Sequence, residues 1–478
     1  EQMNLFKDMV CYQEEVRDPS RIAEVLNRVI EKAIRGSAPA QINVPRDYWT
    51  QVVDIELPPI VRLERQAGGA SAIEEAAKLL SDAKFPVILS GAGVVIGGAI
   101  EDCVNLAEKL DSPVCSGYQH NDSFPGSHPL AVGPLGYNGS KAAMELIAKA
   151  DVVLALGTRL NPFSTLPGYG IDYWPKNAKI IQVDMNSDRI GLTKKVTVGI
   201  CGDAKLVAQQ ILSKLSPKAG DTDRKKRKEL IHQTKSAWLQ KLSSLDHEDD
   251  DPGTVWNKEA RDRDKDRMSP RQAWRAIQAG MPEEVIISSD IGNNCAIGNA
   301  YPTFEKGRKY LAPGLFGPCG YGFPSILGAK IGCPDTPVIG FAGDGAFGIS
   351  MNEMSSCARE EWPAISMVIF RNYQWGAEKR NTTLWFDNNF IGTELDPELS
   401  YAKVANACGL KGVTVKTMEE TTKAIKQSCE DQKKGITTFI EVILNQELGE
   451  PFRRDAMKKP VRVAGIKKED MKPQKGLN

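Results

Sequence analysis

The stretch "PVIGFAGDGAF", at positions 337–347, decides the fold class of this 478-residue chain. It reads as a buried strand that leads into a glycine turn around Asp344 and then into a helix beginning at Ala346. The next apolar run, "AISMVIFRN" at 364–372, ends on Asn372. Consecutive parallel strands lie side by side, so the sequence predicts that Asp344 and Asn372 meet at the carboxyl edge of one sheet.

Two hard oxygen ligands at one sheet edge predict a divalent cation. A helix start carries free N–H groups and favours phosphate, whereas the Asp344 carboxylate repels it. Mg²⁺ can bridge the two, since it takes few protein oxygens and several phosphate oxygens. We expect Asn372 to add an amide oxygen and Gln374 a backbone carbonyl. An isolated Gly-Asp-Gly is more often an ordinary capped turn, and the asparagine after the next strand is what favours the metal site.

The same alternation of helices and short apolar strands fills two regions of the chain. It predicts an α/β fold with two doubly wound parallel sheets, of four strands each, joined by a charged helical linker, together with the remnant of a third domain. The predicted organisation is a partial αβ unit at 1–60, a first domain at 66–215, the linker at 216–268, a second domain at 269–446 and a basic tail at 447–478.

One glycine-rich loop leaves a further ligand open. "GAGVVIGGA" at 91–99 follows a predicted strand, as a dinucleotide-binding loop would. Its glycine spacing is not GxGxxG, and glycine turns after strands are common in doubly wound domains. The sequence therefore does not decide whether this domain holds a nucleotide.

Composition excludes several classes of protein. The 61 basic residues equal the 61 acidic ones, which argues against nucleic-acid binding. No apolar run is long enough to span a membrane, and residues 1–16 lack the features of a signal peptide. Ten scattered cysteines contain no CxxC pair, so neither a zinc site nor a disulfide framework is indicated. We therefore expect a cytoplasmic protein whose true amino terminus precedes Glu1, because no initiator Met is present.

Gly-Asp-Gly followed by Asn372 resembles the diphosphate-binding motif of the thiamine-diphosphate enzymes. "GPCGYGFPSILGAKIG" (317–332) resembles the glycine-rich segment before that motif, and "SFPGSHPLAVGPLGYNGSKAA" (123–143) resembles the family's central domain. The segment at 14–49 resembles the last third of the pyrimidine-binding domain. The resemblance therefore implies that 1–60 is the end of a pyrimidine-binding domain, and that the glutamate that activates the cofactor lies upstream of Glu1.

The family resemblance also implies site residues. Thiamine diphosphate and Mg²⁺ would be the cofactors, with Asp344, Asn372 and Gln374 as metal ligands. The family usually has two asparagines where this chain has Arg371 and Asn372, and the second is the ligand. Cys319 stands where related acetolactate synthases place a larger apolar residue under the bent cofactor. The implied cofactor-binding residues are Gly343, Asp344, Gly345, Ala346, Asn372, Cys319 and Gly320.

The segments "RNYQWGAEKRNTTLWFDNNFIGTEL" (371–395) and "GEPFRRDAM" (449–457) resemble one subgroup, the sulfoacetaldehyde acetyltransferases. That resemblance implies conversion of sulfoacetaldehyde and phosphate into acetyl phosphate and sulfite. Guanidinium and ammonium groups suit both anions, although each such residue is equally well explained as surface. The candidate anion-binding residues are Arg371, Lys379, Arg380, Arg453 and Arg454.

Two alternatives stay open at this point. The chain resembles other thiamine-diphosphate enzymes too, so an acetolactate synthase or a 2-oxo-acid decarboxylase would use the same cofactor with a different pocket. A truncated, non-catalytic chain would keep the fold and the metal site. In this family the cofactor lies between two subunits, so the resemblance implies a homodimer or a homotetramer.

Overall fold

The computed structural model describes residues 1–59, 64–169, 171–244, 264, 266–307, 309–314, 316–385 and 389–446, without the side chains of 221, 380, 381 and 383–385. The chain divides into two units, Glu1–Glu64 and Arg65–Asn478.

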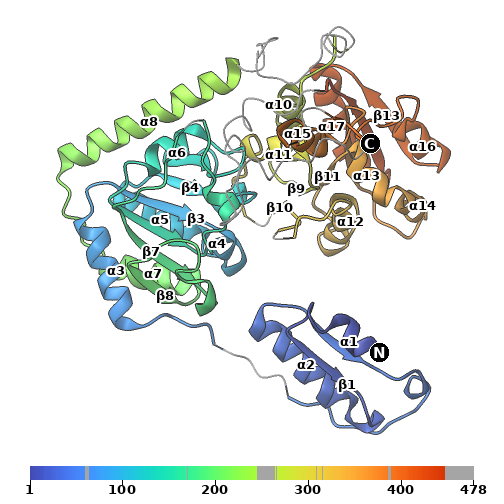
Figure 1. Cartoon of the computed structure of the whole chain (residues 1–478), viewed down its shortest axis with the longest axis horizontal. Coiled ribbons are helices and arrows are strands. Elements are labelled where there is room, and N and C mark those ends of the chain that lie inside the picture. The colour runs from blue at the N-terminus through green and yellow to red at the C-terminus, as the bar shows by residue number, and fades with distance from the viewer. Residues whose placement is uncertain are drawn as a thin grey trace. The chain divides into compact units, whose positions relative to one another are not determined.

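The first unit is a small βαβ arrangement (Figure 1). Its two strands pair in parallel, and α2 packs on them through Val25 and Val29. The αβ unit predicted from the sequence therefore has one strand more than expected. Its elements are α1 (Gln2–Phe6), β1 (Tyr12–Glu15), α2 (Ile22–Gly36) and β2 (Ala40–Asn43).

The second unit contains two sheets, and the first of them has six parallel strands in the order β5-β4-β3-β6-β7-β8. Strands β3 and β6 are buried along their whole length, as expected where helices cover both faces of a parallel sheet. The strands are β3 (Pro86–Ser90), β4 (Val114–Ser116), β5 (Ala131–Pro134), β6 (Val152–Leu156), β7 (Lys179–Asp184) and β8 (Val198–Cys201). The helices are α3 (Ala70–Asp82), α4 (Ala92–Gly97), α5 (Ile100–Leu110), α6 (Lys141–Ile147) and α7 (Ala204–Lys214).

The second sheet also has six parallel strands, in the order β10-β9-β11-β12-β14-β13. Apolar side chains fill both of its faces, with Trp274 against Phe341 and Phe370 on one side. The strands are β9 (Ile286–Ser289), β10 (Tyr310–Leu311), β11 (Val338–Gly343), β12 (Ser366–Arg371), β13 (Lys411–Val415) and β14 (Thr438–Ile443). The helices are α10 (Pro270–Gly280), α11 (Asn293–Ile297), α12 (Gly322–Gly332), α13 (Asp344–Ser350), α14 (Met354–Cys357), α15 (Gly376–Trp385), α16 (Tyr401–Ala407) and α17 (Met418–Gln432).

The prediction of two doubly wound parallel sheets is confirmed, but each sheet has six strands and not four. The four strands that the sequence analysis missed, β5, β8, β10 and β13, are the outermost strands of their sheets. They have two to five residues, and three of them contain glycine, so they show no extended apolar run.

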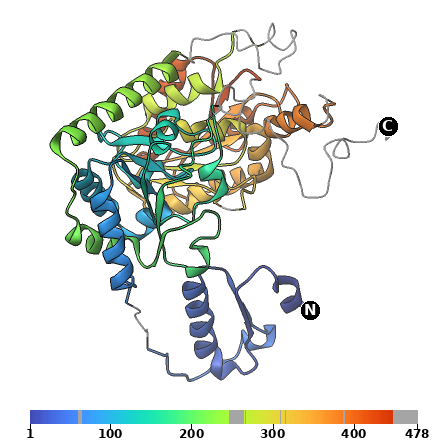
Figure 2. The same cartoon turned by 60° about the vertical axis from the view of Figure 1, so that its left-hand side comes forward.

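A long helix, α8 (Asp221–Ser244), occupies part of the charged stretch between the sheets. In both views it lies along α6 (Figures 1 and 2). Its charged residues are not merely solvated, because Arg227 donates to the carbonyls of Lys84 and Leu110 at 2.6 and 2.9 Å. Ile231 and Trp238 on the same helix are buried. The helix is therefore docked on the first sheet's domain. Within the described residues, no helix is long and apolar enough to cross a membrane.

Candidate active site

Strands β11 and β12 bring the two predicted metal ligands to one sheet edge. Gly343, the last residue of β11, lies opposite Phe370 in the parallel register. Asp344 follows directly and Asn372 lies two residues beyond Phe370, so both leave the sheet at its carboxyl edge. Their exposures are 1% and 2%. The strand adjacency predicted from the sequence is confirmed, and the site itself is buried.

Three contacts from its own sheet edge hold the Asp344 carboxylate. Its Oδ2 accepts the N–H of Tyr373 at 2.6 Å and lies 3.0 Å from the Arg371 guanidinium. Its Oδ1 accepts the N–H of Gly345 at 3.0 Å. A carboxylate oxygen has two lone pairs, so Oδ1 retains one that can bind a cation.

Burial dominates the protonation of this group. It raises the pKa of Asp344 to about 6, while Arg371 and the Tyr373 N–H lower it by stabilising the anion. A metal ion would act in the same direction as Arg371, because a nearby cation favours the ionised carboxylate. The ionised form of Asp344 is therefore unfavourable in this buried position unless a second positive charge lies beside it.

Asn372 and Gln374 have the donor atoms that a magnesium ion needs. The buried Oδ1 of Asn372 and the buried Oε1 of Gln374 have no hydrogen-bond partner in the described structure. Gln374 pairs with Glu394 in an antiparallel bridge that uses the Tyr373 carbonyl and the Trp375 N–H. The backbone carbonyl of Gln374 therefore points away from the 393–395 segment. One carboxylate, one amide oxygen and one carbonyl fit Mg²⁺, which keeps several water or phosphate ligands.

The glycines around Asp344 have a different role from the predicted turn. Gly343 has extended backbone angles, with φ −70° and ψ 158°, and α13 begins at Asp344 itself, earlier than expected. Gly345 is needed for space, since a Cβ there would lie 2.8 Å from the Trp375 ring. A close approach of two segments, and not a glycine turn, thus explains this part of the motif.

These residues line a cleft of about 60 Å³ that sequence reasoning described only in part. Asn293 and Asn294, at the start of α11, also line it, and both are buried. Neither side-chain polar atom of Asn293 has a partner in the described structure, nor has the Oδ1 of Asn294. Buried amides without partners are rare and point to a ligand. The available signal was the "SSDIGNN" run, which follows β9 at the same edge as Asp344.

Asp290, which the sequence analysis also missed, holds the glycine-rich loop beside the cleft. Its carboxylate accepts the N–H groups of Ile291 at 2.8 Å, Gly320 at 3.1 Å and Gly322 at 2.7 Å. Gly320 has φ +86°, which an L side chain would strain. Cys319 lines the cleft, and burial raises the pKa of its thiol, so it is a small neutral side chain there.

Of the predicted anion-binding residues, the structure describes the side chains of Arg371 and Lys379, and neither is a free cation at the cleft. Arg371 is buried against Asp344 and donates to the carbonyl of Leu399 at 2.9 Å, a geometry that does not fit contact with a substrate anion. Lys379 is largely buried and ion-paired with Glu394. The side chain of Arg380, together with Arg453, Arg454 and the whole predicted tail, lies outside the described residues.

The glycine loop at 91–99 is used for packing within the first sheet. The N–H of Gly93 donates to the Gly157 carbonyl at 2.8 Å, and a Cβ on Gly93 would lie 2.7 Å from the Gly157 Cα. A Cβ on Gly91 would lie 2.5 Å from that of Thr158. These glycines therefore allow α4 to approach the end of β6, which explains them without a nucleotide.

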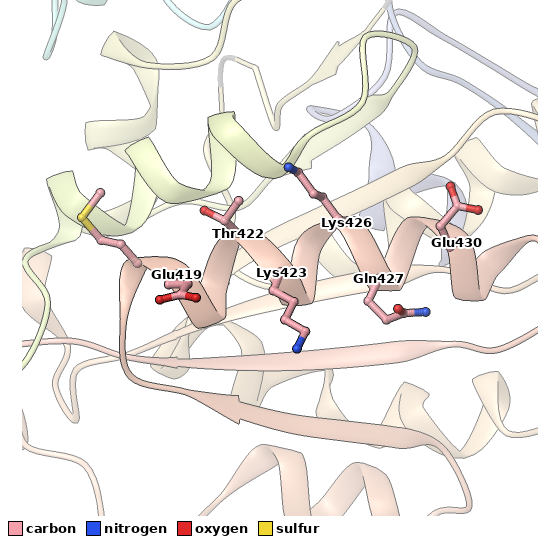
Figure 3. A pocket seen from close by; sticks show the side chains of 7 residues that line it. Glu419, Thr422, Lys423, Lys426, Gln427 and Glu430 are labelled. Carbon is pink, nitrogen blue, oxygen red and sulfur yellow. The ribbon is translucent and has the colours of Figure 1, made fainter.

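A more open groove runs along α17 (Figure 3). All of its lining residues belong to that helix, and they include both acidic and basic side chains, such as Glu419 and Lys423. None of them follows β9, β11 or β12, so the groove is separate from the cleft and we assign it no chemistry.

Comparison with known proteins identifies two family domains in the chain. A family described as "Thiamine pyrophosphate enzyme, central domain" matches residues 73–211, and "Thiamine pyrophosphate enzyme, C-terminal TPP binding domain" matches residues 290–442. The chain is 78% identical to a probable sulfoacetaldehyde acetyltransferase of Rhizobium meliloti, over 100% of the chain and 81% of that protein. It is 73% identical to the sulfoacetaldehyde acetyltransferase of Roseovarius nubinhibens, over 99% of the chain and 79% of that protein.

A solved structure shares the fold. Benzoylformate decarboxylase from Polynucleobacter necessarius superposes with a TM-score of 0.71 at 18% identity, covering 93% of this chain and 78% of that one. With the two acetyltransferases this similar over nearly its whole length, the chain belongs to the sulfoacetaldehyde acetyltransferases, within the family of thiamine-pyrophosphate-dependent enzymes.

Proposed function

We propose that this protein converts sulfoacetaldehyde and phosphate into acetyl phosphate and sulfite, with thiamine diphosphate and Mg²⁺ as cofactors. The observation that carries the proposal is the pair of buried oxygen ligands, Asp344 Oδ1 and the unpartnered Asn372 Oδ1, at the edge of the domain whose sequence matches the family's cofactor-binding domain. The reaction balances without an external oxidant. The aldehyde C–H bond and the carbon–sulfur bond break, and the carbonyl carbon gains the phosphate oxygen. The carbon that carried the sulfonate gains a proton and becomes the methyl group, and the sulfonate leaves as sulfite.

When bound, thiamine diphosphate would supply a nucleophilic carbon and an electron sink, chemistry that amino-acid side chains do not provide. The chain's own residues bind and orient. Asp344, Asn372 and the Gln374 carbonyl would hold the metal ion, and the buried amides of Asn293 and Asn294 would meet the diphosphate. The Trp375 ring packs against Gly345 in the first turn of α13, beside the cleft.

The substrate anions require cations that the described cleft does not offer in free form. Lys379 remains the candidate nearest to the site in sequence, and it would have to exchange its partner Glu394 for phosphate or sulfonate. Arg380, Arg453 and Arg454 remain candidates as well. Glu378 lines the cleft too, so an anion bound there would need a cation to offset this carboxylate.

We also propose that the protein works as a homodimer or homotetramer in the cytoplasm. The cleft of about 60 Å³ is far smaller than the roughly 300 Å³ or more of usual small-molecule pockets, so it suits one end of a cofactor whose other end meets a second subunit. All ten cysteines lie in the described part and are free, which suits a reducing compartment.

The decisive experiment measures sulfite released from sulfoacetaldehyde by the full-length protein with thiamine diphosphate and Mg²⁺, with and without phosphate. We expect phosphate-dependent sulfite and acetyl phosphate, lost in Asp344→Ala. Glu361→Ala is the matched control. Within the described residues this exposed carboxylate of the same domain pairs with Arg359, and its removal should leave the rate unchanged.

Two results would contradict the proposal in different ways. Carbon dioxide from pyruvate or another oxo acid, without sulfite from sulfoacetaldehyde, would keep the cofactor and reject the substrate. Full activity in folded Asp344→Ala would reject the metal site.

A further inference from the structure

A buried arginine links the proposed metal ligand to distant parts of the chain. Arg371 is 1% exposed, and its guanidinium lies 3.0 Å from Asp344 Oδ2. The same guanidinium donates to the carbonyls of Asp396 and Leu399, the latter at 2.9 Å. Its Nε lies 3.8 Å from Oε1 of the buried Glu441. One planar fork therefore joins the end of β11, the 396–399 segment and β14.

The 396–399 segment is the last part of a long connection that leaves the sheet after Asn372, which we call the excursion. The excursion, which the structure describes over 373–385 and 389–399, includes α15. The antiparallel bridge between Gln374 and Glu394 closes its base, with the Trp375 N–H donating to the Thr393 carbonyl at 2.8 Å. Its first turn forms one wall of the cleft, through Gln374, Trp375, Gly376, Ala377 and Glu378.

Two tyrosines complete this connection. The Arg371 guanidinium lies 4.2 Å from the ring centre of Tyr373 and 5.5 Å from that of Tyr401. The Tyr401 hydroxyl donates to the Asp344 carbonyl at 2.9 Å, and its N–H donates to Glu441 at 3.0 Å. The start of α16 is thereby attached to the residue that the metal would bind. A shift of Asp344 would therefore also displace the start of α16, because the groups that join the two are close-packed and buried.

We propose that Arg371 is a positioning residue that fixes the orientation of the Asp344 carboxylate for the metal and couples metal binding to the cleft wall formed by the excursion. This inference rests on the proposed magnesium site and goes beyond it, since it assigns a role to the residue that stands where the family usually has an asparagine. By binding Oδ2, Arg371 leaves Oδ1 with a lone pair for the cation. By binding the carbonyls of Asp396 and Leu399, it holds the base of the excursion.

The first test uses Arg371→Asn, which restores the usual family residue. Isothermal titration of the cofactor-free protein with Mg²⁺ in the presence of thiamine diphosphate should show metal affinity lowered by about 10- to 100-fold, as for other partners that orient metal ligands. In the wild type, Mg²⁺ with thiamine diphosphate should slow tryptic cleavage after Lys379 and Arg380. In the variant this protection should be lost.

The matched control is Arg267→Asn. Arg267 also faces the Tyr373 ring, at 4.9 Å, but its ion pair is with Asp264 at 2.9 Å. It should keep both the metal affinity and the protection. Because Arg371→Asn leaves Glu441 buried without its counter-charge and can fail to fold, the double variant Arg371→Asn/Glu441→Gln provides the same test with the charges balanced.

The inference is overturned if either folded Arg371 variant binds Mg²⁺ as tightly as the wild type or keeps the protection. Loss of affinity in Arg267→Asn equal to that in Arg371→Asn would also overturn it, since the effect would then not depend on contact with Asp344. A wild type that binds no Mg²⁺ with thiamine diphosphate would instead reject the proposed function, and the inference with it.

Discussion

Arg371 and Asp344 form an ion pair of 3.0 Å in which neither side chain is more than 2% exposed. Moving two charges out of water costs more than a single pair usually returns, so such a pair is poor evidence for stability. It is better explained by function, since the proposed metal site requires an ionised carboxylate at a buried sheet edge.

Asn372→Ala should weaken Mg²⁺ binding by at least about tenfold while lowering the thermal midpoint little. The amide oxygen has no hydrogen-bond partner in the described structure, so removing that atom breaks no hydrogen bond there and leaves no new unsatisfied group. Titration calorimetry and thermal melts of the cofactor-free protein measure the two effects. A large loss of stability with unchanged metal affinity would make Asn372 a structural residue.

Gly345→Ala should impair cofactor binding, because the new Cβ would lie 2.8 Å from the Trp375 ring and push one wall of the cleft outward. Overpacking of this kind costs about 1–3 kcal/mol. Gly328→Ala is the matched control: this glycine lies in α12, outside the cleft lining, and its Cβ would meet nothing within 4 Å. The affinity for thiamine diphosphate with Mg²⁺ should fall in the first variant only. Equal losses in both would contradict the role of Trp375.

Stability without metal should depend on pH through Asp344. The pKa of this carboxyl is about 6 in the folded protein, chiefly because of burial, and about 4 when unfolded. A raised pKa contributes stability below about pH 4 that is lost as pH rises through 6. The side chain of Asp344→Asn cannot ionise. The thermal midpoint of this variant should therefore rise relative to that of the wild type as the pH increases from about 4 to 7. A midpoint difference that stays constant, or that moves toward the wild type, would contradict the raised pKa.

Added Mg²⁺ with thiamine diphosphate supplies the test of the same group in the bound state. Because the metal binds only the ionised carboxylate, it should raise the wild-type midpoint more at pH 7 than at pH 5. The Asn variant should show little of this increase at either pH.

Lys379→Met should raise the KM for phosphate and leave the affinity for thiamine diphosphate unchanged, if Lys379 exchanges Glu394 for a substrate anion. Glu394→Gln, which frees the ammonium group, should lower that KM or leave it unchanged. Steady-state kinetics at several phosphate concentrations measure both. An unchanged KM in Lys379→Met would mean that the lysine only stabilises the base of the excursion, through its ion pair with Glu394.

The local sequence determined the fold class and the approach of the two proposed metal ligands, Asp344 and Asn372. Apolar runs such as 337–343 and 364–371 are unambiguous, because strands buried on both faces need apolar side chains throughout. Since parallel neighbours end at one edge, the positions of Asp344 and Asn372 along the chain were sufficient to predict their approach. The outer strands β5, β8, β10 and β13 were not predicted, because they are short and lack such runs.

Only the tertiary structure decided which polar residues are paired. The sequence left Arg371 as either an anion-binding residue or a surface cation, yet it is buried between Asp344 and Glu441, two residues that β11 and β14 bring to its own strand. Gly345 resembled a turn glycine but is required by Trp375, thirty residues later. Asn293 and Asp290 gained a role only when β9 placed them beside β11. Strand periodicity is a local property and can be read from the chain, whereas the partners of a buried charge come from several strands and exist only once the sheet has formed.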